Sequence, residues 1–314
     1  MKFKGFLTDN GVYLLEKRIL HALEKTGKIW HIYITETHLS FLHNLLNGDG
    51  IQSVAQFRKQ ALFDEYRFSS QNDAIAFSID LSLLQRALRS IIATAGTDDG
   101  NKYEMKLVKK LAPHSHQALP FLTFETQGYK SAVIQDVPIS KPLSRPDLLE
   151  LQTALQTAQV IPTCLVQLSD MNQLQSFVDR MKHVGDALNV SISKYGDLHL
   201  QISTTLITLG AEFRKLLVLG EKADMPVGDG DSTAQTRMQR AVLRGDATSV
   251  QVSVKHFFKS LQCHLAKPDC AYFGIVNQGS CLTVIFDFFI PGTRLRDNAI
   301  SLYCRLPVLD PGSS

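Results

Sequence analysis

Hydrophobic positions along this chain change their spacing in an order that recurs four times. In the first copy, a short strand over 1–7 precedes a stretch over 9–25 in which apolar residues return every three or four positions, as on one face of an α-helix. Three β-branched or aromatic runs follow at 29–34, 39–42 and 51–57, separated by turn-forming residues. The pattern predicts a strand, a helix and three further strands.

The same order can be followed to the end of the chain. Predicted helices start near residues 9, 80, 170 and 255, so the copies are roughly 70 to 90 residues apart. Each copy closes with three strand-like runs. Two copies in each half predict an α+β fold of two similar domains, each built from two strand-helix-three-strand units.

Two stretches interrupt this order. Residues 140–159 are polar and rich in Gln, with two Xaa-Pro pairs, which is typical of a connector. We therefore predict an N-terminal domain over 1–139, an interdomain connecting loop over 140–159 and a C-terminal domain over 160–314. Residues 221–246 are rich in Gly, Asp, Ser, Thr and Arg without a sustained period, which predicts a long loop to which no role is assigned.

Length, charge and cysteine content narrow the possible functions. The 314 residues exceed what one hydrophobic core usually fills, which agrees with two domains. A net charge of +3 and a pI near 8.5 argue against a protein that wraps nucleic acid with its whole surface, so any such contact must be local. Five irregularly spaced cysteines are typical of reduced, buried thiols of an intracellular protein, and neither a signal peptide nor a membrane span is expected.

Motifs for enzymatic chemistry are missing from the sequence. It contains no phosphate-binding glycine loop and no Gly-x-Ser-x-Gly elbow. The run 229–233 resembles the start of a calcium loop, but Ala234 stands where the turn needs Gly, and Arg240 where a bidentate Glu belongs. The histidines and cysteines lack zinc-site spacing. We expect no enzyme activity, no cofactor and no metal.

Cations recur on the polar faces of the predicted helices. Taken singly, each is more often part of a solvated helix face. Their recurrence at the same element of each unit favours a shared role, because phosphates need only point charges on a common surface. These candidate phosphate-contacting residues are Lys17, Arg18, His21, Lys25, Arg86, Arg89, Arg180, Lys255 and Lys259.

Several short strings together resemble one known family. Taken alone none is a stringent motif, but their order, spacing and coverage of nearly the whole chain resemble the Hus subunit of the nine-one-one DNA damage checkpoint clamp, most closely its plant members. The strings are Met1-Lys2-Phe3-Lys4, Leu39-Ser40-Phe41-Leu42, Gln56-Phe57 to Ala61-Leu62-Phe63, Asp136-Val137-Pro138-Ile139, Phe177-Val178-Asp179-Arg180-Met181-Lys182 and Leu198-His199-Leu200-Gln201-Ile202.

The resemblance implies a sliding-clamp fold and a toroidal assembly. In such a ring, this subunit joins one Rad-nine-type and one Rad-one-type partner around double-stranded DNA, with the sheets outside and the helices lining the channel. A clamp loader and recruited repair enzymes are the further partners it implies, without a membrane. It also implies a role in DNA repair and checkpoint signalling in the nucleus, with a cytoplasmic pool.

Two further sets of site residues follow from the resemblance. Ring closure by strand pairing points to strands over 131–139 and 206–214, with Val133, Pro138, Ile207 and Phe213 as interface residues. Docking of partner peptides beneath the connector points to Leu143, Leu148, Leu149 and Pro307. Two alternatives stay open, a homotrimeric replication-type clamp with the same fold and a protein-binding α+β adaptor that never touches DNA.

Overall fold

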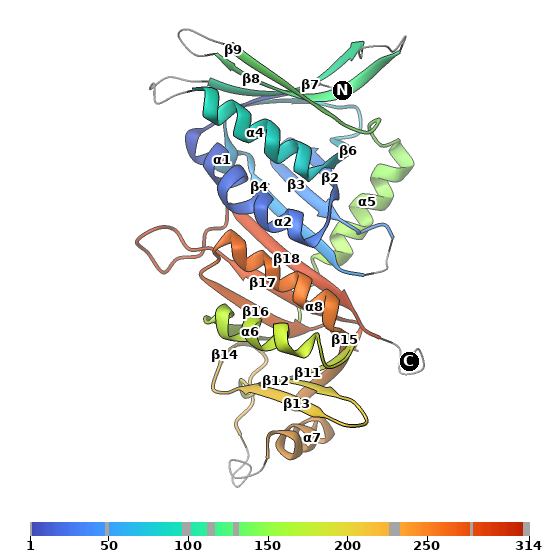
Figure 1. The fold of residues 1–314 in the computed structure, drawn as a ribbon, viewed down its shortest axis with the longest axis vertical. Helices are drawn as coiled ribbons and strands as arrows, with labels where there is room; N and C mark the ends of the chain where they lie inside the picture. The colour runs from blue at the N-terminus through green and yellow to red at the C-terminus, as the bar shows by residue number, and fades with distance from the viewer. Residues whose placement is uncertain are drawn as a thin grey trace.

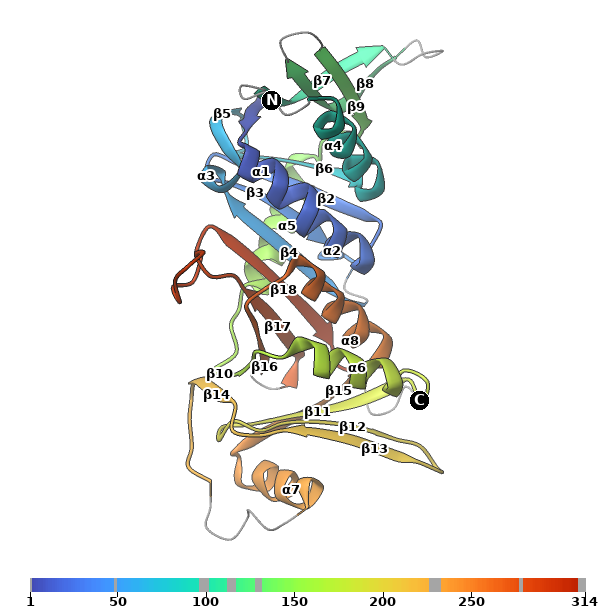
Figure 2. The same cartoon turned by 60° about the vertical axis from the view of Figure 1, so that its left-hand side comes forward.

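The protein is elongated, with helices along one broad face and sheets behind and beside them (Figure 1 and Figure 2). Three antiparallel sheets of five, nine and four strands form the framework. The structure, a computed structural model, describes residues 2–47, 50–95, 102–111, 117–127, 132–225, 233–276 and 279–309.

The first domain begins with a strand and a helix formed by three consecutive helical segments, the middle one a π-helical turn. The hydroxyl of Thr8 caps this helix by accepting a hydrogen bond from the Gly11 N–H at 2.8 Å. The elements in order are β1 (Lys2–Leu7), α1 (Asp9–Tyr13), η1 (Leu14–Ile19), α2 (Leu20–Thr26), β2 (Ile29–Thr35), β3 (His38–His43), β4 (Gln52–Arg58), α3 (Lys59–Leu62), β5 (Phe63–Ser69), β6 (Ala74–Asp80), α4 (Leu81–Ala95), β7 (Lys102–Leu111), β8 (Ala118–Gln127) and β9 (Ala132–Pro138).

The second domain repeats this order of strands, with helix α7 added and without a counterpart of α3. A further helix, α5 (Arg145–Ala158), connects the domains. The elements that follow are β10 (Cys164–Leu168), α6 (Met171–Met181), β11 (Ala187–Ser193), β12 (Leu198–Ser203), β13 (Thr208–Phe213), β14 (Leu217–Gly220), α7 (Ala234–Arg244), β15 (Ala247–Ser253), α8 (Val254–Leu261), η3 (Gln262–Ala266), β16 (Cys270–Ile275), β17 (Cys281–Asp287) and β18 (Ile300–Pro307).

The strand orders of the sheets display the repeat directly. The five-stranded sheet has the order β5-β1-β7-β8-β9, and the second domain repeats it as β14-β10-β16-β17-β18. The four-stranded sheet has the order β13-β12-β11-β15, and the first domain repeats it as β4-β3-β2-β6. These two copies are joined edge to edge, β18 to β4, into the nine-stranded sheet. One buried hydrophobic cluster runs through both domains.

The connector between the domains is mostly helical, so the prediction of a loop is wrong over 145–158. Ser144 and Asp147 form a capping box that starts α5. Leu148, Leu151 and Leu155 lie on one face of the helix and are buried against the outer face of the nine-stranded sheet. This apolar stripe fixes the connector to the domains that it joins.

The prediction of one long loop over 221–246 is also wrong, because its last part forms α7. Thr233 caps this helix through its hydroxyl, and Gly245 ends it in the left-handed conformation with a φ of 79°. The run 229–233 resembles the start of a calcium loop. Its first four residues, 229–232, lie outside the described residues. Two strands that the sequence analysis did not predict, β5 and β14, complete the repeat.

Candidate functional site

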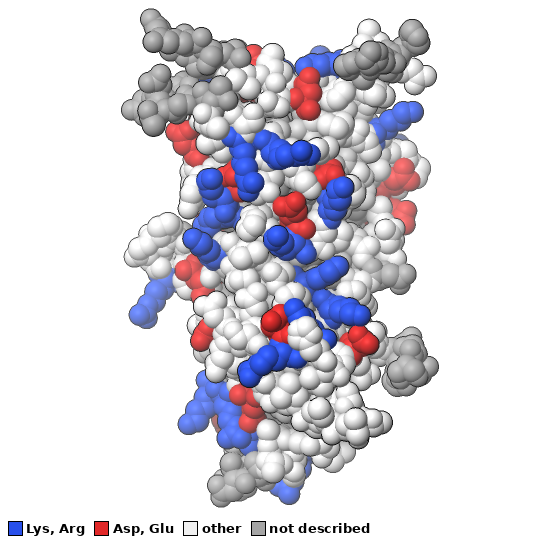
Figure 3. Space-filling model, viewed as in Figure 1, with Lys and Arg blue, Asp and Glu red and all other residues white. Residues whose placement is uncertain are grey.

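The helix layer consists of α1, η1, α2 and α4 of the first domain and of α6 and α8 of the second. Its outer side is the candidate DNA-facing surface. Each helix buries one apolar stripe against the sheets, as α8 does with Phe257 and Leu261, and exposes its polar side, on which Lys255 and Lys259 lie. The helix layer forms one continuous face in Figure 1, and Figure 3 shows Lys and Arg spread along the length of that face. The cations predicted from the four helices therefore share one surface.

Arg18 is an exception among the predicted cations, because its guanidinium is engaged within the protein. Its Nε donates to the Ala266 carbonyl and its Nη2 to the Lys267 carbonyl, both at 3.0 Å. The guanidinium also lies over the Phe288 ring, 5.2 Å from its centre. Arg18 thus connects the first helix to the end of η3 in the second domain. This role differs from that of an exposed cation that only attracts phosphates.

Lys17 and Arg89 share the buried carboxylate of Glu16. Arg89 Nε donates to Glu16 Oε1 at 2.8 Å, and Lys17 Nζ lies 3.0 Å from Oε2. Burial alone would raise the pKa of the Glu16 carboxyl, but the hydrogen bonds from Arg89 and Lys17 outweigh it and hold that pKa below the ordinary 4.5. The two cations remain on the surface, more than half exposed, while one of their charges is balanced.

We expect Glu16→Gln to lower the free energy of unfolding at neutral pH by about 1 to 3 kcal/mol, because charge-assisted hydrogen bonds are lost. Because both cations are exposed, we expect a loss near the lower end of this range. A depressed folded pKa contributes stability above the unfolded pKa of about 4.5, and that stability is lost as the pH falls through the folded value. Urea unfolding should therefore separate the two chains at pH 7 and bring them together in acid. Equal stability at pH 7 would contradict this role of Glu16.

The remaining predicted cations have few charged neighbours. Within the described ranges, no carboxylate forms an ion pair with Lys25, Arg86 or Lys259. His21, on α2, is half-buried. Lys255 Nζ lies 3.2 Å from Asp186 Oδ1, with both side chains largely exposed, and Arg180 lies over the ring of Phe177. Lys25, Arg86 and Lys259 are therefore the best placed to attract a polyanion.

The strands predicted for ring closure lie at the edges of their sheets. β9 pairs only with β8, and β13 pairs only with β12, as far as the described strands extend. Val133 lies in β9 opposite Thr126, and exposed Pro138 ends that strand; Phe213 ends β13. Each edge offers backbone groups to a further strand.

Ile207 does not belong to β13, so the predicted strand over 206–214 begins too early. Its N–H donates to the hydroxyl of Thr204 at 3.1 Å, and its carbonyl accepts from the Thr204 N–H at 2.8 Å. This turn stops the ladder, and β13 starts at Thr208. Ile207 is more than half exposed beside the edge.

The residues predicted for a partner groove are divided between core and surface. Leu148 is only 6% exposed and packs with partly buried Leu143 against the outer face of the sheet, whereas Leu149 on α5 is 55% exposed. Pro307, at the end of β18, is half-buried opposite Cys281. Helix α5 itself therefore covers much of the surface on which a docked peptide was expected.

A mostly apolar cavity of about 250 Å³ remains at the C-terminal end of α5. Val160 and Ile161 form one wall, and Ile285 of β17 and Tyr303 of β18 lie across from them. Both residues are β-branched, as in a strand, but β10 starts only at Cys164. The signal for the break was Pro162, which follows them directly.

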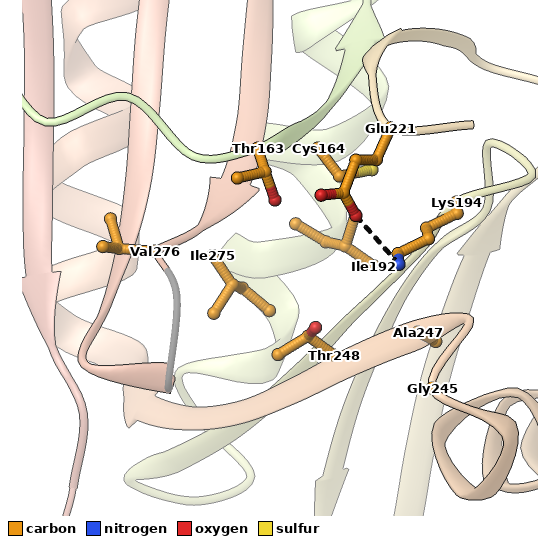
Figure 4. Close-up of a pocket in the computed structure, with 10 residues that line it drawn as sticks. All are labelled: Thr163, Cys164, Ile192, Lys194, Glu221, Gly245, Ala247, Thr248, Ile275 and Val276. Atoms are coloured by element: carbon orange, nitrogen blue, oxygen red, sulfur yellow. Dashed lines mark ion pairs between the residues drawn. The ribbon is translucent and has the colours of Figure 1, made fainter.

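A polar cavity of about 240 Å³ lies in the second domain between the ends of β10, β11, β15 and β16 (Figure 4). Lys194 and Glu221 form an ion pair of 2.9 Å across it, and the half-buried thiol of Cys164 lies beside them. Burial raises the pKa of this thiol, which disfavours the thiolate that a nucleophile needs. The Lys194–Glu221 pair balances its own charge within the cavity.

Neither a metal site nor a membrane-spanning helix occurs in the described ranges. There, no three His, Cys, Asp or Glu side chains come together in a way that could hold a metal ion. Nor does any helix in these ranges combine the length and the apolar composition needed to cross a membrane.

The layers and sheet orders are those of a sliding clamp. Proliferating cellular nuclear antigen from Entamoeba histolytica superposes on 98% of this chain and 99% of its own with a TM-score of 0.60, and 11% of the residues are identical, a likeness that concerns the fold. The predicted clamp fold is confirmed.

The chain belongs to the family of Hus1-like proteins, whose family model matches residues 1–294. It is 25% identical over 306 residues to the checkpoint protein hus1 homolog of Dictyostelium discoideum, covering 93% of this chain and 98% of that protein. It is 24% identical over 221 residues to checkpoint protein HUS1 of Homo sapiens, covering 69% and 74%. The resemblance seen in the sequence is thus confirmed, and the family and fold are those of non-enzymatic scaffold proteins.

Proposed function

We propose that this chain is one subunit of a heterotrimeric checkpoint clamp that encircles double-stranded DNA in the nucleus. The observation that carries the proposal is one face of exposed cations combined with two open strand edges at opposite ends of the molecule. The cations attract the duplex, and the edges join the subunit to its two neighbours. A clamp loader would place the ring on DNA, and repair enzymes would be recruited to it.

The join between the two domains supports the way in which the ring closes. β18 and β4 pair antiparallel over six residues, from Ile300 opposite Phe57 to Arg305 opposite Gln52. By the repeat, β9 is the counterpart of β18, and β13 is the counterpart of β4. The chain thus contains one example of the junction that its free edges could make with similar neighbours. A head-to-tail junction of this kind generates a ring when its rotation closes.

The membership of the chain in the Hus1-like family favours different neighbours over copies of the chain itself. Co-expression with Rad-nine-type and Rad-one-type subunits should give a stable 1:1:1 complex, measured by size exclusion with light scattering. The chain alone should run as a monomer of 35.0 kDa. A trimer of the chain alone would support the homotrimeric replication-type clamp instead, and a monomer that joins no clamp subunit would support the adaptor without DNA contact.

Partner peptides would dock on the outer face at the connector. Exposed Leu149 lies on α5, and the cavity walled by Val160 and Ile161 lies at the C-terminal end of this helix. That cavity takes an aliphatic or aromatic anchor of a repair enzyme, and its apolar walls lose water when the anchor enters.

Ile161→Asp should weaken the binding of a repair enzyme to the assembled ring by about 1 to 3 kcal/mol, because a charge is placed at the mouth of an apolar cavity. Ile161 is 65% exposed, so the fold should be unaffected. Leu111→Asp, at a position that is 69% exposed on the five-stranded sheet, is the matched control. Surface plasmon resonance with immobilised ring measures both. Equal binding of the two variants would exclude this cavity from recruitment.

A further inference from the structure

The join between the two domains consists of more than paired strands. Arg18 donates to the carbonyls of Ala266 and Lys267 at the end of η3, and its guanidinium lies over the Phe288 ring. Helix α2 also packs directly against η3. The last carbonyls of a helix have no partner within it, so one planar guanidinium can satisfy two of them. An arginine of the copy that contributes β4 thus binds the last helical turn of the copy that contributes β18.

Arg180 occupies the corresponding position in the copy that contributes β13. The helix caps provide the alignment, because Thr8 caps α1 and Asp170 caps α6. Arg18 and Arg180 each lie ten residues after the cap of their helix. In both copies the residue that follows the arginine is fully buried. The two arginines therefore have the same orientation about their helix axes relative to the sheets.

The side chain of Arg180 lies on the flank of α6 that faces away from α8. On the other flank, Lys182 lies over the Phe258 ring of α8, with its Nζ 4.4 Å from the ring centre. Residues two apart on a helix point to nearly opposite sides, so Arg180 points towards the side on which the sheet ends in β13. The first copy has the same arrangement: Glu16 pairs with a side chain of α4, and Arg18, two residues later, reaches η3.

The free edge beside Arg180 matches the internal junction in length. Six residues of β4, Gln52–Phe57, pair with β18, and β13 also has six residues, Thr208–Phe213. The guanidinium of Arg180 is exposed in the single chain and lies over the half-buried Phe177 ring, 5.4 Å from its centre. A neighbour paired with β13 as β18 pairs with β4 would bring its last helical turn to Arg180, as η3 lies at Arg18.

We propose that Arg180 is a residue of the junction between subunits, where its guanidinium binds the carbonyls at the end of the neighbour's helix that corresponds to α8 and η3. The partner is thus the clamp subunit that pairs with β13. The inference rests on the proposed ring and assigns a residue by which this chain holds one neighbour. It also moves Arg180 from the cations that attract phosphates to the contacts between proteins.

The proposal is tested by binding of the full chain to each Rad-type subunit separately, measured by biolayer interferometry. The neighbour at β13 is the one whose binding is lost when Gly210 or Ala211 is replaced by Pro, because proline blocks that edge. Arg180→Ala should weaken binding to this neighbour about tenfold or more and leave binding to the other neighbour unchanged, because charge-assisted hydrogen bonds are lost at one junction only. Arg145→Ala, which removes an exposed arginine of α5, is the matched control and should change neither.

Two further variants separate a bridge from a simple charge. Arg180→Lys keeps the charge but not the planar fork, so it should not restore binding to the neighbour at β13. Arg18→Ala removes the equivalent bridge inside the chain and should lower the melting temperature of the isolated chain. Arg180→Ala should leave that temperature unchanged, because its side chain is exposed until the neighbour binds.

The proposal is overturned if Arg180→Ala binds both neighbours normally, or if Arg180→Lys binds as tightly as the unchanged chain. If Arg180→Ala assembles normally and only lowers the salt slope of DNA binding by the ring, by about 0.9, Arg180 is a phosphate contact instead. If the unchanged chain binds neither neighbour, the proposed ring is overturned and this junction with it.

Discussion

A proline at the free edge of β9 should abolish ring assembly while the isolated chain stays folded. Successive N–H groups of a strand point to opposite sides in the sheet plane, so of Val133 and Ile134 one donates to β8 and the other faces the free edge. Proline removes that donor and its ring clashes with an incoming strand, and the carbonyl left unpaired in the junction costs up to about 3 kcal/mol. Such a loss weakens the junction about 100-fold.

Making both variants, Val133→Pro and Ile134→Pro, separates the two effects. The one that blocks the free edge should keep its melting temperature and lose the 1:1:1 complex in size exclusion, whereas the other should lose stability. The adjacent pair Gly210→Pro and Ala211→Pro tests β13 in the same way. Val218→Pro and Leu219→Pro on β14, an edge strand outside the proposed junctions, are the matched controls. Normal assembly of all four variants in β9 and β13 would exclude the proposed closure.

Replacing Lys25, Arg86 and Lys259 together by Ala should weaken DNA binding by the assembled ring about tenfold and flatten its salt dependence. Each phosphate contact contributes about 0.9 to the slope of log affinity against log salt, so three lost contacts reduce the slope by up to about 2.7. Sequence preference should not change, because contacts with phosphates carry no sequence information. Alanine favours helix, so the fold should persist.

The matched control removes the same charge elsewhere. Lys141, Arg145 and Lys222 are exposed outside the helix layer, and their replacement by Ala lowers the net charge equally. Fluorescence anisotropy with a labelled duplex, measured over a range of salt concentrations, compares the two rings. If both triple variants lose the same affinity, net charge is the cause and the helix face has no special role. If neither loses affinity, the adaptor without DNA contact gains support.

Amphipathic periodicity was sufficient to predict the helices of the repeat, because each buries a single stripe under a sheet. The helix α5 was missed although its signals were present. The Ser144-x-x-Asp147 box and the spacing of Leu148, Leu151 and Leu155 both indicate a helix, but the Gln-rich composition and Pro146 were interpreted as a connector. Proline is tolerated in the first turn of a helix, so Pro146 does not argue against α5. Here the spacing of the leucines predicts the structure better than the composition does.

Other features depend on contacts that a single sequence does not display. Arg18 reaches carbonyl groups about 250 residues further along the chain, so its role as a bridge could not be separated from that of a surface cation. The burial of Arg237 likewise depends on Glu212 and Asp197 meeting beneath α7. Strand β5 gave a weak signal, because only Phe63, Tyr66 and Phe68 interrupt an otherwise polar run.

The pairing of β18 with β4 decides where a ring built from this chain can open. Hydrogen bonds of a continuous sheet, the stripe of α5 and the Arg18 bridge all span the middle of the subunit. Bending there would break these contacts together, whereas a seam between neighbours consists of two strand edges. In the proposed ring, each such subunit would therefore respond to a clamp loader as one stiff unit, and the ring would open at a seam between neighbouring subunits.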